Sequence, residues 1–306
     1  MRKPSDWISF FFLTFFAVTS VSHAVLAQKS ENPLSELGKQ LFFHTGLSKN
    51  RNLSCGTCHQ SNSAFTDSRK KIAKGSLSGG TSTNSFGRRN TPTLTYASLI
   101  PPLTITDGVA TGGLFFDGRS DFFEDQIQHP LFAPSEMDME NKELLLSRVM
   151  EDPNLTTRFK NIFGDNIFDN LHSFFSGLTS AIASFERSQV FFSFDSKYDR
   201  FLQDEYKMTP LENKGYRIFF SDVSNCMNCH LLQKSTLSRK EPFSDHRYHN
   251  IGVPKNPELL KNKYLGSSHI DLGLAENSKF ASELHEGKFR TPTLRNAAVT
   301  PPYMHN

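Results

Sequence analysis

The pentapeptide Cys55-Gly56-Thr57-Cys58-His59 constrains this chain most, because the pattern returns as Cys226-Met227-Asn228-Cys229-His230. Cys-x-x-Cys-His is the attachment signature of c-type haem. The spacing lets each thiol add to one vinyl group of the same porphyrin, while the next histidine reaches the iron. The two motifs use all 4 cysteines of the 306-residue chain. We therefore expect two covalently bound haem c groups, with His59 and His230 as iron ligands.

Two other uses of a Cys-x-x-Cys pair fit this sequence less well. In a zinc ribbon the partner pair lies roughly 15–20 residues away, whereas here most of the chain separates the two pairs. A thioredoxin-like redox pair needs a βαβ context, which the surrounding pattern lacks. Neither alternative explains why a histidine follows both pairs.

The N-terminus has the pattern of a secretory signal. Arg2 and Lys3 precede the apolar residues 8–21, and Val25-Leu26-Ala27 offers a cleavage site before Gln28. The alternative is a membrane anchor, but the apolar run is short for a transmembrane span. We expect a signal peptide over residues 1–27, a periplasmic protein and no stable membrane insertion after cleavage. The net charge of +3 argues against a nucleic-acid partner.

Apolar residues at helical spacing predict a mainly α fold. Helices are expected over residues 35–43, 121–128, 140–150, 167–190 and 211–220, the second of them stopped by Pro130. Residues 74–89 and 108–113 are rich in glycine or small polar residues and are expected to be loops.

The two halves of the chain echo each other. Ala64-Phe65-Thr66-Asp67 has a counterpart in Pro242-Phe243-Ser244-Asp245, and Thr91-Pro92-Thr93-Leu94 recurs as Thr291-Pro292-Thr293-Leu294. This indicates an internal duplication of one haem-binding domain. We expect two cytochrome c-like domains, residues 28–195 and 196–306, each with one haem and the second incomplete at its C-terminus.

Several stretches, taken together and in order, resemble the bacterial di-haem cytochrome c peroxidases, including the MauG-like di-haem enzymes. They are Leu53-Ser54 with the first haem motif, Arg89-Asn90-Thr91-Pro92-Thr93, Phe116-Asp117-Gly118-Arg119, Pro134-Ser135-Glu136-Met137, the second haem motif, Asn250-Ile251-Gly252-Val253-Pro254, and residues 289–296 with 302–305. The resemblance implies that the first haem reacts with peroxide and that the second receives electrons.

The resemblance also implies roles for single residues. Glu136 and Gln126 match an acid–base pair beside the open face of the first haem, where a carboxyl group can move a proton between the peroxide oxygens. Asn90, with the backbone oxygens of Thr300 and Pro302, matches the protein ligands of one calcium ion. Without the resemblance, Glu136 would be read as a solvated loop acid, Gln126 as a helix-surface amide and Asn90 as a turn residue.

Three departures from the family pattern matter. Residues 74–89 contain no histidine, although peroxidases of this family carry one there that blocks the first iron. Phe116 stands where the family usually has tryptophan between the haems. The sequence ends at Asn306, before the segment that carries the distal ligand of the second haem in the family.

From these features we predict a periplasmic enzyme that reduces hydrogen peroxide to water with electrons from a small cytochrome c or a cupredoxin. One alternative is a MauG-like oxidase that modifies a protein or an organic substrate. The other is a non-enzymatic di-haem electron carrier, which would have both irons six-coordinate. A homodimer is compatible with the sequence.

Overall fold

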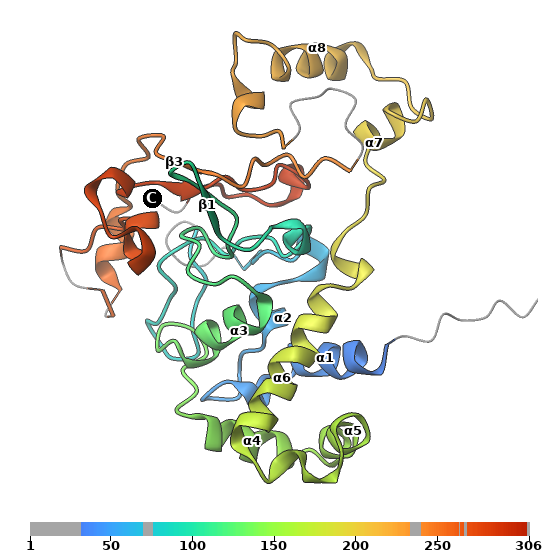
Figure 1. The fold of residues 1–306 in the computed structure, drawn as a ribbon, viewed down its shortest axis with the longest axis vertical. Coiled ribbons are helices and arrows are strands. Elements are labelled where there is room, and N and C mark those ends of the chain that lie inside the picture. The colour runs from blue at the N-terminus through green and yellow to red at the C-terminus, as the bar shows by residue number, and fades with distance from the viewer. Residues whose placement is uncertain (1–31, 70–75, 233–239, 263, 266–267, 305–306) are drawn as a thin grey trace, which may run out of the picture. The chain divides into compact units, whose positions relative to one another are not determined.

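The computed structural model describes residues 32–69, 76–232, 240–262, 264–265 and 268–304, and these are mainly helical where they are regular (Figure 1). The helices are α1 Pro33–Phe43, α2 Cys55–Cys58, α3 Phe123–Phe132, α4 Lys142–Met150, α5 Pro153–Phe163, α6 Leu171–Glu186, α7 Lys197–Phe201 and α8 Pro210–Phe219. The strands are β1 Thr104–Thr106, β2 Val109–Thr111, β3 Tyr248–His249 and β4 Phe289–Arg290. The expected signal peptide lies outside the described residues.

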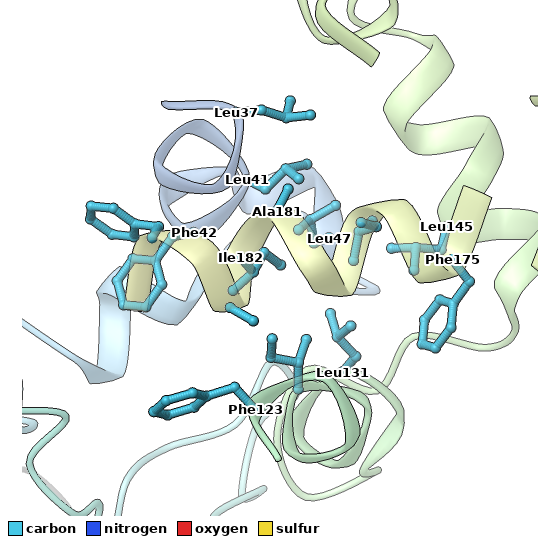
Figure 2. Packing of buried hydrophobic residues seen from close by; sticks show 14 of the residues in the cluster. Leu37, Leu41, Phe42, Leu47, Phe123, Leu131, Leu145, Phe175, Ala181 and Ile182 are labelled. Atoms are coloured by element: carbon cyan, nitrogen blue, oxygen red, sulfur yellow. The ribbon is translucent and has the colours of Figure 1, made fainter. Parts of the chain in front are cut away.

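Helix α6 is the centre of the main apolar core, with α1 and α3 packed against it. Leu41 of α1 and Ala181 and Ile182 of α6 are fully buried, and Figure 2 shows them gathered around the α6 ribbon with Leu131 of α3 on another side. Gly38 permits the close approach of α1, because a β-carbon at this position would collide with the carbonyl group of Ala181. This core fixes α3, which carries part of the candidate site.

Helix α3 does not stop before Pro130, as the sequence suggested, but continues to Phe132 with the proline inside it. Proline removes one backbone donor and usually ends or kinks a helix. Here Ile127 and Leu131, four residues apart on one face, are both buried in the core. Their burial stabilises the last turn despite the missing hydrogen bond.

The long helix expected over residues 167–190 is shorter in the structure. Asp165–Phe168 forms a separate 3₁₀ helix, and α6 begins after Asn170, whose side chain accepts a hydrogen bond from the amide of Ser173. Helix α5 was missed, although Asp152 is a good N-cap and Pro153 a favoured first residue. Helices α1, α4 and α8 match the ranges expected for them within two residues.

The expectation of a loop over residues 108–113 was wrong, because residues 109–111 form β2 and pair with β1. Ile105 lies opposite Ala110 in this antiparallel hairpin. The connecting residues Asp107 and Gly108 both have positive φ, at 51° and 76°. An Asp-Gly pair favours this two-residue turn, so the local sequence did contain the signal. The other pair, β3 with β4, joins Tyr248 to Arg290.

Among the described residues no helix is both long and apolar enough to cross a membrane. The described part of the expected loop over residues 74–89, residues 76–89, contains neither helix nor strand, as expected.

Candidate functional site

The first motif forms the short helix α2, and His59 follows at its C-terminus. Ser54 and Thr57 cap the helix, since the Ser54 amide donates to the Thr57 hydroxyl at 2.9 Å. The Nδ1 atom of His59 lies 2.9 Å from the carbonyl oxygen of Phe65. With Nδ1–H donating to this carbonyl, Nε2 is the nitrogen left for a metal. Burial lowers the pKa of His59, and this hydrogen bond opposes the shift only in part. The lowered pKa favours the neutral imidazole that iron binds.

The second motif repeats this arrangement. The Nδ1 atom of His230 lies 3.2 Å from the carbonyl oxygen of Phe243. Phe65 and Phe243 share a rare left-handed backbone, with φ of 56° and 53°. Burial also lowers the pKa of His230. Both histidines are therefore oriented by the same kind of contact, although they lie far apart in the sequence.

Two threonines brace these histidine-holding turns in the same way. The hydroxyl of Thr93 donates to the carbonyl of Ala64 at 2.5 Å, and that of Thr293 donates to the carbonyl of Pro242 at 2.6 Å. In each case the accepting residue directly precedes the phenylalanine that holds the histidine. The repeated Thr-Pro-Thr-Leu stretches therefore support the two haem motifs.

The four cysteines do not form a single zinc site in the part of the chain that the structure describes. All four are free of disulfides. The one group of potential metal ligands found among the described residues joins Cys229 to Asp245 and His249, not to Cys55 and Cys58. This arrangement removes the support for a zinc ribbon.

A cavity of about 340 Å³ brings the first motif together with the expected acid–base pair. Its lining includes Cys55, Cys58, His59, Arg88, Asn90, Phe116, Arg119, Gln126, His129, Glu136, Glu186 and Arg290. Two thiols and an oriented, neutral imidazole in one cavity are the donor set that a c-type haem needs. The residues present therefore fit this group.

Glu136 lies in the turn after α3. Its amide donates to the carbonyl of Ala133, and its own carbonyl accepts from the amide of Thr81 at 2.8 Å. Burial raises the pKa of the Glu136 carboxyl, while the positive charges of Arg119 and Arg88 oppose this rise. Gln126 reaches the same cavity from α3. Gln126, Glu136 and His59 therefore line one cavity, and the acid–base role of the first two residues stays a prediction.

Sequence reasoning missed His129 and Glu186, which also line the cavity. His129 follows Gln126 by three residues on α3, so it shares a face with Gln126, and this spacing could have signalled it. Its ring meets that of Phe115 edge to face, with centroids 5.2 Å apart. Glu186 ends α6, and its position in the cavity depends on helix packing that no local pattern reports.

A buried ion-pair network borders this cavity. Arg89 pairs with Asp117 and with Asp271, each at 2.6 Å, and Arg119 also pairs with Asp117 at 2.7 Å. Burial pushes the pKa of Asp117 upward, but the neighbouring guanidinium groups outweigh it and hold the pKa below its usual value. The network fixes the Phe116-Asp117-Gly118-Arg119 stretch against residues near the C-terminus.

Comparison with known proteins identifies the family. Residues 32–207 match the family model described as di-haem cytochrome c peroxidase. The chain belongs to this family. It is 39% identical over 290 residues to the methylamine utilization protein MauG of Paracoccus denitrificans, covering 94% of this chain and 74% of that protein. It is 28% identical over 280 residues to a cytochrome c551 peroxidase of Nitrosomonas europaea, covering 89% of this chain and 68% of that protein.

A solved structure extends the family relationship to the fold. The di-haem peroxidase BthA of Burkholderia thailandensis superimposes with a TM-score of 0.81 at 30% identity, covering 89% of this chain and 68% of that one. Membership of the di-haem family implies two haem c groups, in agreement with the two Cys-x-x-Cys-His motifs.

The structure brings together two of the three residues expected at a calcium site. The Nδ2 atom of Asn90 donates to the carbonyl of Pro302 at 2.7 Å, and Thr300 lies two residues before Pro302. Calcium binds oxygen atoms only, so Asn90 would have to present Oδ1 to the ion.

Proposed function

We propose that this di-haem enzyme reduces hydrogen peroxide to water in the periplasm, with electrons from a small redox protein. The observation that carries the proposal is the single cavity that holds His59, both thiols of the first motif, and Glu136 with Gln126. When bound there, a haem supplies an iron centre that exchanges electrons with peroxide.

The chain's own residues would bind, orient and protonate the peroxide. Glu136 lines the cavity, and burial raises the pKa of its carboxyl group, which makes its carboxylate a stronger base. We infer that its carboxylate takes the proton from the near oxygen of the peroxide and that the resulting carboxyl group gives this proton to the far oxygen, which the Gln126 amide orients by hydrogen bonding. Arg119 and Arg88 limit the rise in pKa, which keeps the group able to release its proton.

Electrons would enter at the second motif, whose surroundings are more open. Val223, close before Cys226, is 93% exposed, and Leu232, after His230, is 47% exposed. Exposed apolar side chains around a redox site suit a transient complex with a small cytochrome c or cupredoxin. A homodimer remains part of the proposal.

The proposal is tested by the stoichiometry of peroxide reduction. One hydrogen peroxide takes up two electrons and two protons and gives two waters. Purified protein with a reduced small cytochrome c or cupredoxin should therefore oxidise two donors for each peroxide consumed. Peroxide loss without donor oxidation would contradict the peroxidase function.

A MauG-like oxidase is the second candidate, and the 39% identity to the Paracoccus methylamine utilization protein favours it. Such an enzyme would use peroxide to oxidise a protein or an organic substrate, with the small redox protein contributing slowly or not at all. Incubation of a cell extract with the protein and peroxide, followed by mass spectrometry, would show a new oxidative modification on one substrate. The protein lacking its first motif would be the control.

Several finer features belong to the same proposal. The matched contacts of His59 with Phe65 and of His230 with Phe243 support an internal duplication, with one haem each in residues 28–195 and 196–306. We further infer that residues 1–27 direct export and that one calcium ion binds near Asn90. N-terminal sequencing and metal analysis of the purified protein test these two points.

A further inference from the structure

Glu186 is a buried carboxyl group without a polar partner. Its side chain is 5% exposed, and no hydrogen-bond partner lies within reach of Oε2. It lies at the last residue of α6 and lines the cavity that contains Cys55, Cys58 and His59. A buried charge without a partner is very costly, so such a group is held mainly in its neutral, protonated form.

Few charged groups act on Glu186. Arg187, the next residue, is engaged by Glu124 of α3 through two hydrogen bonds of 2.7 and 2.8 Å. Burial raises the pKa of Glu186 to about 8, while Arg187 lowers it and Glu124 raises it. Cys55 of α2 lines the same cavity, and burial and the charge of Glu186 both raise the pKa of its thiol. The other titratable groups lining the cavity are Cys58, His59, Arg88, Arg89, Arg119, His129, Glu136 and Arg290.

We propose that Glu186 is the redox-linked proton site of the first haem. Its carboxylate takes up one proton from solvent when the iron accepts one electron, and its carboxyl group releases that proton when the iron is oxidised again. The electron comes from a small redox protein or from a chemical mediator. Charge therefore balances inside the cavity at each one-electron step. The inference rests on the proposed function only in requiring a haem at Cys55 and Cys58.

The physical reason is electrostatic coupling in a site of low dielectric. A negative carboxylate stabilises the more positive, oxidised iron, and the oxidised iron in turn favours loss of the proton. In the proposed function, Glu136 moves a proton between the two peroxide oxygens, so its role differs from that of Glu186. Glu186 lines the same cavity as the first haem-attachment thiol, Cys55, and would act on the iron whether or not peroxide is present.

The experiment is a spectroelectrochemical titration of both haems between pH 6 and 10 in the holoprotein, without peroxide. In the wild type, the potential of one haem should fall as pH rises through the region around 8. A tenfold change in proton concentration corresponds to at most about 59 mV for a one-electron couple. In Glu186→Gln this slope should vanish at that haem, and the potential of the other haem should keep its wild-type pH dependence.

Glu124→Gln is the matched control, because it removes a nearby carboxylate that is not part of the cavity lining. The variant frees Arg187 from its pair with Glu124, so the pKa of Glu186 should fall. The pH dependence of the haem potential should therefore persist but move to lower pH. A potential that is independent of pH in the wild type, or an equal slope in wild type and Glu186→Gln, would overturn the proposal.

A second measurement covers the case in which Glu186→Gln does not fold. The infrared difference spectrum between reduced and oxidised wild type at pH 8 should show a protonated carboxyl band that appears on reduction, and Glu136→Gln should retain it. Absence of this band in the wild type, or its loss in Glu136→Gln, would contradict the assignment. Neither readout depends on peroxidase activity, so failure of the proposed function would be seen separately.

Discussion

The guanidinium group of Arg89 donates a hydrogen bond of 2.6 Å to the carboxylate of Asp271, a residue 182 positions further along the chain. The same guanidinium pairs with Asp117, and all three side chains are almost fully buried. Arg89→Met would leave two buried carboxylates short of a partner. We expect it to lower the free energy of unfolding by about 3–5 kcal/mol, measured by urea denaturation at pH 7.

The unfolding free energy lost in Arg89→Met should decrease as the pH falls. The pKa values of Asp117 and Asp271 lie below their usual range, so their pairing stabilises the fold above about pH 4 and is lost as pH falls through the folded values. The difference between wild type and Arg89→Met should therefore shrink from pH 5 toward pH 2. Arg51→Met, which breaks the exposed pair with Glu151, is the control and should change little. An equal loss of unfolding free energy in Arg89→Met and Arg51→Met would contradict the idea that burial strengthens the Arg89 ion pairs.

Haem content tests the two motifs. Wild-type protein should carry two haems per chain by the pyridine haemochrome assay, and acid solvent should extract neither of them. The double variant Cys226→Ser with Cys229→Ser should keep one, because the first motif sits in a separate turn held by its own contacts. A single extractable haem in the wild type would contradict covalent attachment at both sites.

The spin state of the oxidised protein tests access to the first iron. No histidine occurs in residues 74–89, so the first haem should be open, give a high-spin EPR signal and react with peroxide without prior reduction. His129 lines the same cavity and is the histidine that could still bind there. A purely low-spin spectrum that becomes high-spin in His129→Ala would identify His129 as the ligand and refute the open site.

Phe116 lines the cavity of the first motif, and its backbone carbonyl accepts a hydrogen bond of 2.9 Å from the amide of Arg290. Phenylalanine is hard to oxidise, so it is a poor stepping stone for electrons. We expect Phe116→Trp to speed electron transfer between the haems, measured by flash photolysis of the half-reduced protein. Phe116→Leu is the control for packing. An unchanged rate in Phe116→Trp would mean that direct tunnelling suffices.

Glu136→Gln keeps the size of the side chain but cannot exchange a proton. Loss of general acid–base catalysis of this kind costs about 10²–10⁴-fold. We expect the rate of the peroxide reaction at limiting peroxide to fall by this order, with haem content and the spectrum of the second haem unchanged. The pKa of Glu136 is raised, so in the wild type the rate should decrease as pH falls through that raised value, and the variant should lack this decrease. Turnover close to wild type would exclude Glu136 as the proton carrier.

The chemistry of the site could be predicted from the sequence because it depends on fixed local spacing. Two thiols and a histidine within five residues can bind one porphyrin in any fold, so the haem motifs can be recognised from the sequence alone. Glu136 and Gln126 were found only through resemblance to a family, since neither residue type is distinctive alone. His129 belongs to no motif, and only its spacing of three residues from Gln126 on α3 indicates that it shares the site.

Two expectations based on local sequence were wrong, the helix end at Pro130 and the loop over residues 108–113. The sequence predicted a stop at Pro130, but burial of Ile127 and Leu131 in the core outweighs the lost hydrogen bond. It predicted a loop over residues 108–113, although Asp107-Gly108 specifies a tight hairpin turn. Tertiary packing explains the first difference, and the local turn preference of Asp107-Gly108 explains the second.

The sequence by itself determined the haem-attachment chemistry, the mainly helical class and the repeated turns that hold His59 and His230. Only the tertiary structure decided that Arg89 meets Asp271 and that Glu186 lines the same cavity as Cys55. The physical reason is that a haem motif is a property of neighbouring residues, whereas the burial and charge around a carboxyl group depend on which distant segments pack against it.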